Sequence, residues 1–298
     1  MRSALLLLCF LPFVAACATD APAPSEDVAE TSGTDEVYDT SRIVTLGGPL
    51  TEITYALGMG ASVVGTDRSS LYPEDVNALP RLDVYRQTSP EGVLSLTPTL
   101  VVALEGTGPA GVVEQIESAG VSVVMFPEAT SLDEATERIE QLGEIYGAEL
   151  AADSLATRLR TEVQAAEAMR PAEAPRALFI YARGAAVVLV SGTGNDIDAA
   201  MTLAGAENAV TAFEGFRPLT AEAVASAAPD IILLPQRGLE SLGGIDGLLN
   251  QPGLRQTPAG QNQNVIGVDD GMLLGFGPRA GEGIQDLAQR LSELPVPE

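Results

Sequence analysis

An internal repeat constrains the fold of this chain more than any other feature. Residues 88–102 read TSPEGVLSLTPTLVV, and residues 219–233 read LTAEAVASAAPDIIL. In each segment a Ser or Thr precedes a glutamate, a short helix is expected, and a proline leads into an apolar strand. The hydroxyl can cap the helix, and Glu91 or Glu222 falls in its first turn, where the helix dipole favours negative charge. The repeat therefore predicts two similar halves.

Each half has the pattern of an α/β lobe. Residues 42–46 (RIVTL) and 178–181 (LFIY) are apolar strands that open the two halves, and helical spacing over 50–57 leads to a strand at 63–65. This β-α-β start is typical of a parallel sheet covered by helices. Residues 131–170, rich in Ala, Glu, Leu and Arg, predict a helix, a loop and a long helix. We therefore expect an N-terminal lobe at 42–145, a bridging helix at 146–174, a C-terminal lobe at 175–298 and a ligand groove between the lobes.

The ionisable residues exclude several classes of protein. The chain has 41 acidic and 16 basic residues, every basic one an arginine, so its formal net charge of −25 argues against nucleic-acid binding. It has no histidine, and its two cysteines, Cys9 and Cys17, lie at the N-terminus. A Ser-His-Asp or Cys-His catalytic centre and a histidine zinc site are therefore impossible. No nucleophile–base pair, phosphate loop or metal cluster is evident, so we expect a protein that is not an enzyme.

The N-terminus has the pattern of an export signal. Residues 1–17 place Arg2 before a short apolar stretch, and small residues then precede Cys17, as in a bacterial lipoprotein signal. Residues 18–41 carry seven acidic and no basic residues, a composition typical of a disordered tether. We therefore predict an extracytoplasmic protein that reaches the membrane only through a lipid on Cys17. The alternative is an ordinary signal peptide cut nearby.

Several longer motifs stand out along the chain. They are RIVTLGGPLTEITYALG, SSLYPEDVNALP and SPEGVLSLTPTLVVA in the first half, and SGTGNDIDAAMTLAGAENAV, FRPLTAEAVASAAPDIILL, RGLESLGGIDGLLNQPGL and LLGFGPR in the second. Together they resemble the motifs of periplasmic haem-binding proteins of ABC importers. The opening and the Pro-Asp strand motif are shared with siderophore and cobalamin binders. The resemblance implies a class III periplasmic-binding-protein fold, haem as the transported ligand, and a monomer that serves an ABC permease dimer with its ATPase. It also implies that Glu91 and Glu222 dock onto permease arginines; the alternative is that both only stabilise their helices.

The haem site implied by the resemblance needs an iron ligand. Without histidine or a spare cysteine, a tyrosine phenolate or a methionine remains, and ferric iron prefers the anionic oxygen. In the family this tyrosine lies two residues ahead of an arginine. Here Arg86 matches the arginine, whereas Val84 holds the tyrosine position and Tyr85 follows one residue late. Tyr85 is the candidate ligand, and the alternative is a surface tyrosine.

The haem also needs apolar walls and cations for its two propionates. Arginine forks bind carboxylates in bidentate geometry, and Arg86, Arg237 and Arg183 follow strands or lie beside glycines. Arg279 is expected to be a solvent-exposed ion-pair partner. Tyr72 and Tyr181 are further candidates for the groove.

Two alternatives to haem import remain open. The same fold binds ferric siderophores or corrinoids in related proteins. A lipoprotein that scavenges haem without serving a permease would also carry these motifs.

Overall fold

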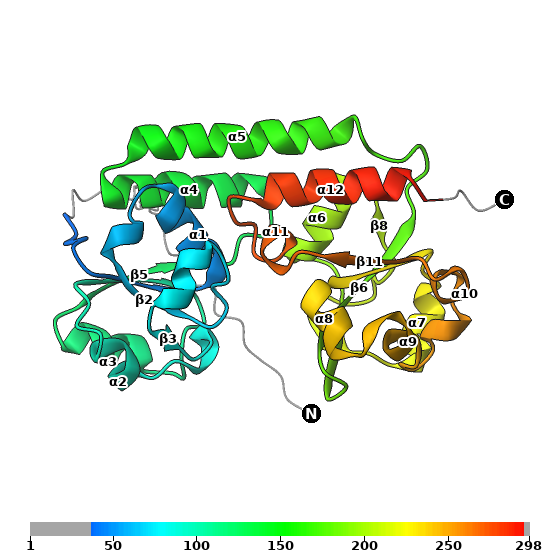
Figure 1. Cartoon of the computed structure of the whole chain (residues 1–298), viewed down its shortest axis with the longest axis horizontal. Coiled ribbons are helices and arrows are strands. Elements are labelled where there is room, and N and C mark those ends of the chain that lie inside the picture. The colour runs from blue at the N-terminus through cyan, green and yellow to red at the C-terminus, as the bar shows by residue number, and fades with distance from the viewer. Residues whose placement is uncertain (1–36, 295–298) are drawn as a thin grey trace, which may run out of the picture. The chain divides into compact units, whose positions relative to one another are not determined.

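The computed structural model describes residues 37–294. The predicted signal peptide, Cys17 and most of the predicted tether lie outside these residues. Within them, two α/β lobes are each built on one sheet, and three long helices lie along the lobes (Figure 1). No helix of the described part is long and apolar enough to cross a membrane.

The sheet of the first lobe has five parallel strands in the order β3-β2-β1-β4-β5. Its central strands carry continuous apolar runs because helices cover both faces of a parallel sheet. All five residues of β4, for example, are buried. The strands are β1 (Ile43–Leu46), β2 (Val63–Asp67), β3 (Arg81–Leu82), β4 (Leu100–Leu104) and β5 (Ser122–Phe126).

Short helices connect the strands of the first lobe. Helix α1 follows β1 directly, and its residues from Leu50 to Thr54 are all buried. The helices are α1 (Gly48–Ala56), α2 (Pro90–Leu94), α3 (Val112–Ser118) and α4 (Leu132–Tyr146), with 3-10 turns η1 (Gly60–Ser62), η2 (Glu74–Ala78) and η3 (Tyr85–Gln87).

The sheet of the second lobe is mixed, which corrects the expectation of a purely parallel sheet. Its order is β11-β10-β6-β7-β9, where β6 pairs with β10 in parallel but β7 runs antiparallel to both β6 and β9. The second half therefore opens with a hairpin rather than a strand followed by a helix. The strands are β6 (Arg176–Arg183), β7 (Val187–Ser191), β8 (Glu207–Asn208), β9 (Phe216–Pro218), β10 (Ile231–Pro235) and β11 (Val265–Val268).

Helices of the second lobe surround this sheet. Helix α6 begins at Asp196, where Asn195 caps it by accepting a hydrogen bond from the backbone N–H of Asp198. The helices are α6 (Asp196–Ala204), α7 (Ala221–Ala227), α8 (Gln236–Ser241), α9 (Gly244–Leu249), α10 (Pro258–Asn262), α11 (Asp270–Leu273) and α12 (Ala280–Ser292), with the 3-10 turn η4 (Leu254–Gln256).

A long helix, α5 (Glu149–Glu167), joins the two lobes by packing on α4 of the first and on α12 of the second (Figure 1). Helix α4 ends at Gly147, whose φ of 64° lets the chain turn back into α5. The two helices approach closely where Gly143 faces Ala152, because glycine has no side chain. A Cβ on Gly143 would lie only 2.4 Å from the Cβ of Ala152. The apolar residues whose spacing predicted these helices pack in one core, which includes Leu142, Leu159 and Val163.

The structure extends the internal repeat to positions that the sequence comparison did not align. Within the aligned segments, Thr97 and Ala228 stand at the same position and both adopt the left-handed conformation, with φ of 46° and 39°. Arg42 donates to the carbonyls of Leu96 and Thr97, and Arg176 donates to that of Ala227. Because these arginines correspond, Ala177 of the second half matches Ile43 of the first. Residues 178–181 therefore match residues 44–47.

Candidate functional site

Tyr85 and Arg86 form a polar cluster with Glu128, a residue that follows β5. The Tyr85 hydroxyl donates to Glu128 Oε1 at 2.5 Å and accepts from Arg86 Nε at 2.9 Å. Arg86 also forms an ion pair with the same carboxylate oxygen, and its guanidinium carbon lies 4.9 Å from the centre of the Tyr85 ring. The phenol oxygen is therefore placed between a cation and an anion.

A buried carboxylate holds the backbone of this tyrosine. Asp67, at the carboxyl end of β2, accepts from the N–H of Tyr85 at 3.0 Å. It also accepts from the N–H of Gly47 and from the hydroxyls of Ser69 and Ser70. Since Asp67 is fully buried, these hydrogen bonds offset the cost of burying its charge. They fix the loop that contains Tyr85 at the edge of the first sheet.

The cluster keeps the phenol protonated in the absence of a metal. Burial and the hydrogen bond to Glu128 raise the pKa of Tyr85 far above its ordinary value, although Arg86 opposes the shift. For Glu128, burial acts to raise the pKa, but the hydrogen bonds from Tyr85 and Arg86 outweigh it and leave a net lowering. Glu128 is therefore an anion that accepts the phenol proton in a hydrogen bond.

The second lobe carries its own tyrosine–arginine pair. Tyr181 and Arg183 are two residues apart at the end of β6, so both side chains lie on one face of the strand. The Arg183 guanidinium carbon lies 5.6 Å from the centre of the Tyr181 ring. The end of this strand packs on α8, where the N–H of Gly184 donates to Ser241 Oγ. Arg237 lies on the same helix, beside Gly238.

Three described arginines, Arg183, Arg217 and Arg237, form no ion pair, and their side chains donate no hydrogen bond within residues 37–294. Arg217 stacks on Phe213 at 4.5 Å. Arg237 attracts the carboxylate of Asp270, whose pKa is nevertheless raised because burial dominates. Unpaired cations are unusual in so acidic a chain, and they leave charge available for an anionic ligand.

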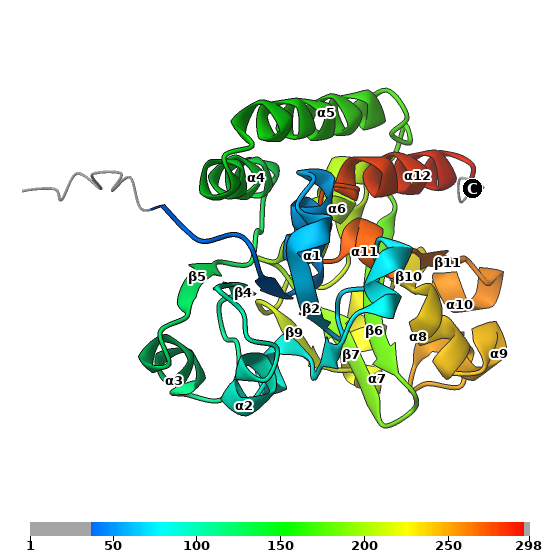
Figure 2. The same ribbon diagram turned by 60° about the vertical axis from the view of Figure 1, so that its left-hand side comes forward.

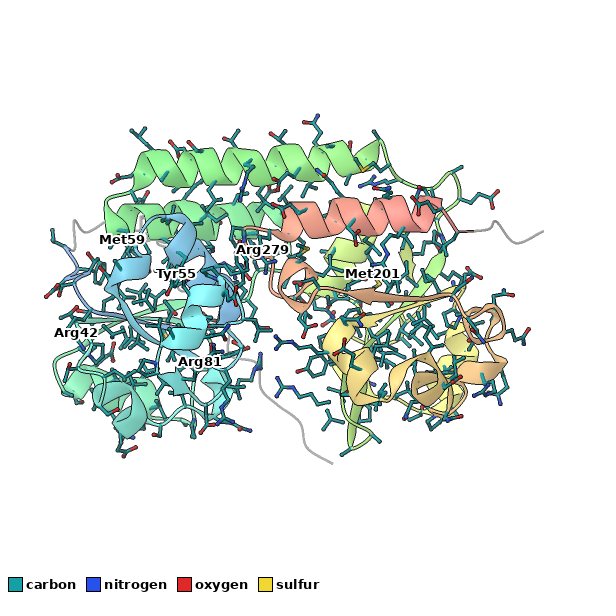
Figure 3. All side chains as sticks on the ribbon, viewed as in Figure 1. Arg42, Tyr55, Met59, Arg81, Met201 and Arg279 are labelled. Carbon is teal, nitrogen blue, oxygen red and sulfur yellow. The ribbon has the colours of Figure 1, made fainter. Side chains whose placement is uncertain are left out.

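Arg279 is not the solvent-exposed residue that we expected. Its side chain, labelled in Figure 3, is 13% exposed and forms a two-pronged ion pair with Glu52 of α1, at 2.9 and 2.8 Å. Its guanidinium carbon also lies 4.0 Å from the centre of the Tyr72 ring. Burial raises the pKa of Glu52, and the hydrogen bonds from Arg279 oppose that shift. This buried pair connects the start of α12 in the second lobe to α1 in the first.

A second buried arginine clamps the same loop. Arg138 of α4 donates to the carbonyls of Gly275 and Phe276, each at 2.7 Å, while Asp196 of α6 accepts from the N–H of Gly275. Burial lowers the pKa of Arg138 to about 10 and raises that of Asp196. Residues 275–279 of the LLGFGPR motif are thus held by side chains from both lobes.

The two repeated glutamates occupy equivalent places. Ser89 and Thr220 cap helices α2 and α7, each accepting from a backbone N–H at 3.2 Å. Glu91 and Glu222 lie in the first turn of these helices, and both are exposed. Neither side chain forms an ion pair within the described residues. Both carboxylates are therefore free to meet a partner.

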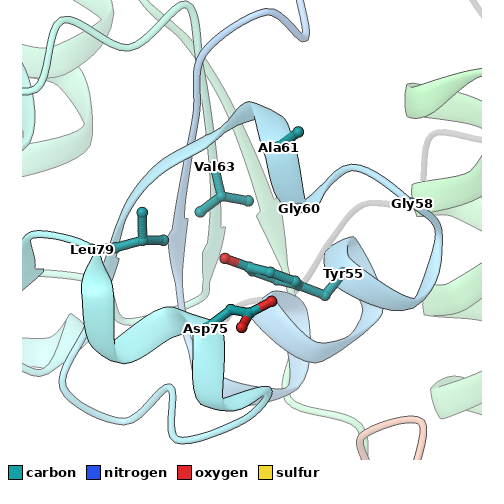
Figure 4. A pocket seen from close by; sticks show the side chains of 7 residues that line it. All are labelled: Tyr55, Gly58, Gly60, Ala61, Val63, Asp75 and Leu79. Carbon is teal, nitrogen blue, oxygen red and sulfur yellow. The ribbon is translucent and has the colours of Figure 1, made fainter.

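A pocket on the first lobe lies apart from these residues. It encloses about 490 Å³ beside α1 and η2 (Figure 4). Tyr55 points across it toward Val63, and burial, together with Asp75, raises the pKa of Tyr55. None of the residues predicted for the ligand site lines it. Its lining is Tyr55, Gly58, Gly60, Ala61, Val63, Asp75 and Leu79.

Sequence reasoning missed Glu128, Glu52, Arg138 and Asp196. Glu128 had a signal, because it follows an apolar strand at the edge where ligands bind in parallel sheets. Glu52, Arg138 and Asp196 look like ordinary charged residues of surface helices. No group of three or more His, Cys, Asp or Glu residues in the described part could hold a metal ion.

Comparison with known proteins defines the class. The family model described as periplasmic binding protein matches residues 43–271. The chain therefore belongs to the periplasmic binding protein family, a family of solute binders, and its two-lobed fold agrees with that membership.

Three relatives show which kinds of binding protein the chain is similar to. The chain is similar to the periplasmic haem-binding protein RhuT from Roseiflexus sp. RS-1, with 40% identity over 86% of this chain and 99% of that one, and a TM-score of 0.82. It is 28% identical to the uncharacterised ABC transporter substrate-binding lipoprotein YvrC of Bacillus subtilis, over 85% of this chain and 80% of the relative. It is 26% identical to a cobalamin-binding protein of Halobacterium salinarum, over 90% of this chain and 73% of the relative. All three are named as binding proteins, in agreement with the expectation of a protein without enzymatic activity.

Proposed function

We propose that this protein binds haem and delivers it to an ABC importer. The observation that carries the proposal is the Tyr85–Arg86–Glu128 cluster, in a chain similar to a haem-binding protein over 99% of that protein's length. A phenolate oxygen is the hard anionic ligand that ferric iron prefers, and this chain has no histidine to compete.

In this proposal each member of the cluster has a role. The Tyr85 hydroxyl releases its proton to solvent, its oxygen binds the haem iron, and the positive charge of Arg86 stabilises the phenolate that results. Glu128 holds Arg86 against the phenol, so Arg86 serves the iron ligand rather than a propionate. The propionates are left to Arg183 and Arg237, which have no acidic ion-pair partner among the described residues. Tyr72 and Tyr181 stay candidates for the walls of the groove between the lobes.

The experiment is a titration of the purified protein with ferric haem, followed by its visible spectrum. We expect saturable binding with a phenolate-to-iron charge-transfer band. Tyr85→Phe should remove that band, whereas Tyr55→Phe, in the separate pocket, should keep it. Saturable binding with a band that survives Tyr85→Phe would keep haem as the ligand and move the iron ligand to Tyr181 or Tyr72. No saturable binding would contradict the proposal.

A corrinoid is the second candidate ligand, because the cobalamin-binding relative aligns with 90% of this chain. Titration with cyanocobalamin under the same conditions separates the two. Tight binding of cyanocobalamin without binding of haem would replace the proposed ligand and leave the transport role in place.

Delivery and anchoring complete the proposal. Glu91 and Glu222 would contact the two subunits of a permease dimer, which suits their equivalent positions in the two lobes. Cys17 would carry the lipid that keeps this monomer on the extracytoplasmic side of the membrane. Membrane fractions should therefore contain the wild-type protein, and Cys17→Ser should release it.

A further inference from the structure

The ribbon of strands β6, β7 and β9 is where the second lobe departs from the repeated plan. In the first lobe, β1 pairs along its length with the parallel strand β2. In the second lobe, the equivalent strand β6 pairs only briefly with β8, and its carboxyl half pairs with the antiparallel strand β7 (Figure 2). The ribbon therefore adds a surface that the first lobe lacks.

The strand register assigns side chains to the two faces of this ribbon. Tyr181 lies opposite Leu189, and Leu189 lies opposite Pro218 on the next strand. Directly opposite residues of antiparallel strands share a face, as do residues two apart. Phe179 and Phe216 also share it, and their rings meet edge to face at 6.5 Å. One face thus carries Phe179, Tyr181, Arg183, Val187, Leu189, Phe216 and Pro218, and it is called the ribbon face below.

The other side of the ribbon is covered by the core. Ile180 and Val190 are fully buried there, and Val188 packs against the same cluster. On the ribbon face, by contrast, Phe179 and Ser191, which lies opposite Phe216, are buried, whereas the other side chains are half-buried or exposed. Phe216 is 39% exposed and Val187 is 40% exposed. An apolar surface on β7 and β9, continued by the half-buried Tyr181 of β6, is therefore left open.

The charge at one end of the ribbon face indicates its occupant. Arg183 extends from the same face as Tyr181 and has no acidic partner among the described residues, in a chain with a net charge of −25. A flat apolar ring that carries carboxylates matches an open apolar sheet face with a cation at its edge. A corrin is bulkier above and below its ring than a porphyrin, and its periphery carries amides rather than carboxylates.

We propose that the ribbon face is the second lobe's contact surface for the porphyrin ring, with Phe216 and Leu189 packed against the ring and Arg183 paired with a propionate. This inference rests on the proposed function, and it assigns a role to Phe216 and Leu189 that neither the sequence motifs nor Tyr85 predicts. The contact depends on the ring and not on the iron, so it should also hold iron-free protoporphyrin IX.

The test compares ferric haem, protoporphyrin IX and its dimethyl ester in titrations of the purified protein. Phe216→Ser should weaken binding of haem and of protoporphyrin by the same factor, about tenfold, since one aromatic contact is lost. The charge-transfer band of the haem complex should be unchanged. Phe216→Trp keeps an aromatic ring and should keep the affinity. Arg183→Gln should weaken protoporphyrin but not the dimethyl ester, which has no free carboxylate.

The matched control is Leu150→Ser on α5, an apolar residue that is 85% exposed and lies outside the ribbon face. It should leave all three affinities unchanged, and a thermal melt of each variant checks that the fold is retained. Wild-type affinity in Phe216→Ser, or an equal loss in Leu150→Ser, would overturn the inference while haem binding stands. A wild-type protein that binds none of the porphyrins would overturn the proposed function itself.

Discussion

The two lobes each present a tyrosine beside an arginine, but only one of these tyrosines has an acidic partner. Tyr85 in the first lobe donates to Glu128, while Tyr181 in the second stacks with Arg183 and has no acidic partner among residues 37–294. The difference follows from the sheets. In the first lobe, parallel β2 and β5 bring Asp67 and Glu128 to the edge that holds Tyr85. In the second, an antiparallel hairpin takes the place of β2, and its face is apolar. The repeated sequence thus leads to a polar cluster in one lobe and to an apolar strand face in the other.

The largest effect on transport is expected where the lobes are most alike. Glu91→Arg or Glu222→Arg should each reduce haem uptake by cells more than about tenfold, since a reversed charge against permease arginines is repulsive. Haem affinity of the purified protein should not change. Glu114→Arg, an exposed first-turn glutamate of α3 without a repeat counterpart, is the control and should transport normally. Transport that depends on only one of the two glutamates would break the symmetry of the comparison.

The next effect separates the two tyrosines. Tyr85→Phe should lower haem affinity by more than about 100-fold, because residues that merely support a metal ligand already cost 10–100-fold. Tyr181→Phe should cost less than about tenfold, since the ring contact with the porphyrin is retained. Equilibrium titrations measure both values. The reverse order would make the second lobe the donor of the iron ligand.

The third effect concerns the buried ion pair that joins the two lobes. Arg279→Met leaves Glu52, which is 5% exposed, without its cation and should cost about 3 kcal/mol of unfolding free energy. Arg68→Met, in an ion pair whose side chains are 68% and 63% exposed, should cost less than about 1 kcal/mol. Urea unfolding of both variants measures the difference. Equal costs would show that the buried pair does not stabilise the junction.

The smallest effect concerns the pH dependence of that junction. Burial raises the pKa of Asp196 above the ordinary value of 3.8. The Asp196 carboxylate therefore binds a proton more tightly in the folded protein than in the unfolded chain. The stability that this proton contributes is complete below pH 3.8, and it is lost as the pH rises through the folded-state pKa. Asp196→Asn has no such loss. The unfolding free energy of the variant, relative to wild type, should therefore increase as the pH rises. A difference that is independent of pH would contradict the shifted pKa.

Part of the candidate site could be predicted from the sequence, and the reasons are local. The caps at Ser89 and Thr220 and the glutamates that follow them depend on a few neighbouring residues, so the repeat located them. The family resemblance singled out Tyr85 and Arg86, whose side chains meet in the structure. Glu128 is distant in sequence from Tyr85, and nothing near it marks it as the partner of a phenol.

The sequence by itself determined the α/β class, the two lobes, the long helix between them and the absence of histidine and cysteine chemistry from residues 18–298. These features follow from periodicity, turn residues and composition, which act over short stretches of chain. Only the tertiary structure decided the antiparallel ribbon of the second lobe, the burial of Arg279 and Arg138, and the contacts of Glu52 and Asp196. Those outcomes depend on packing between distant segments, because a charged side chain needs a partner of opposite charge only once packing has buried it.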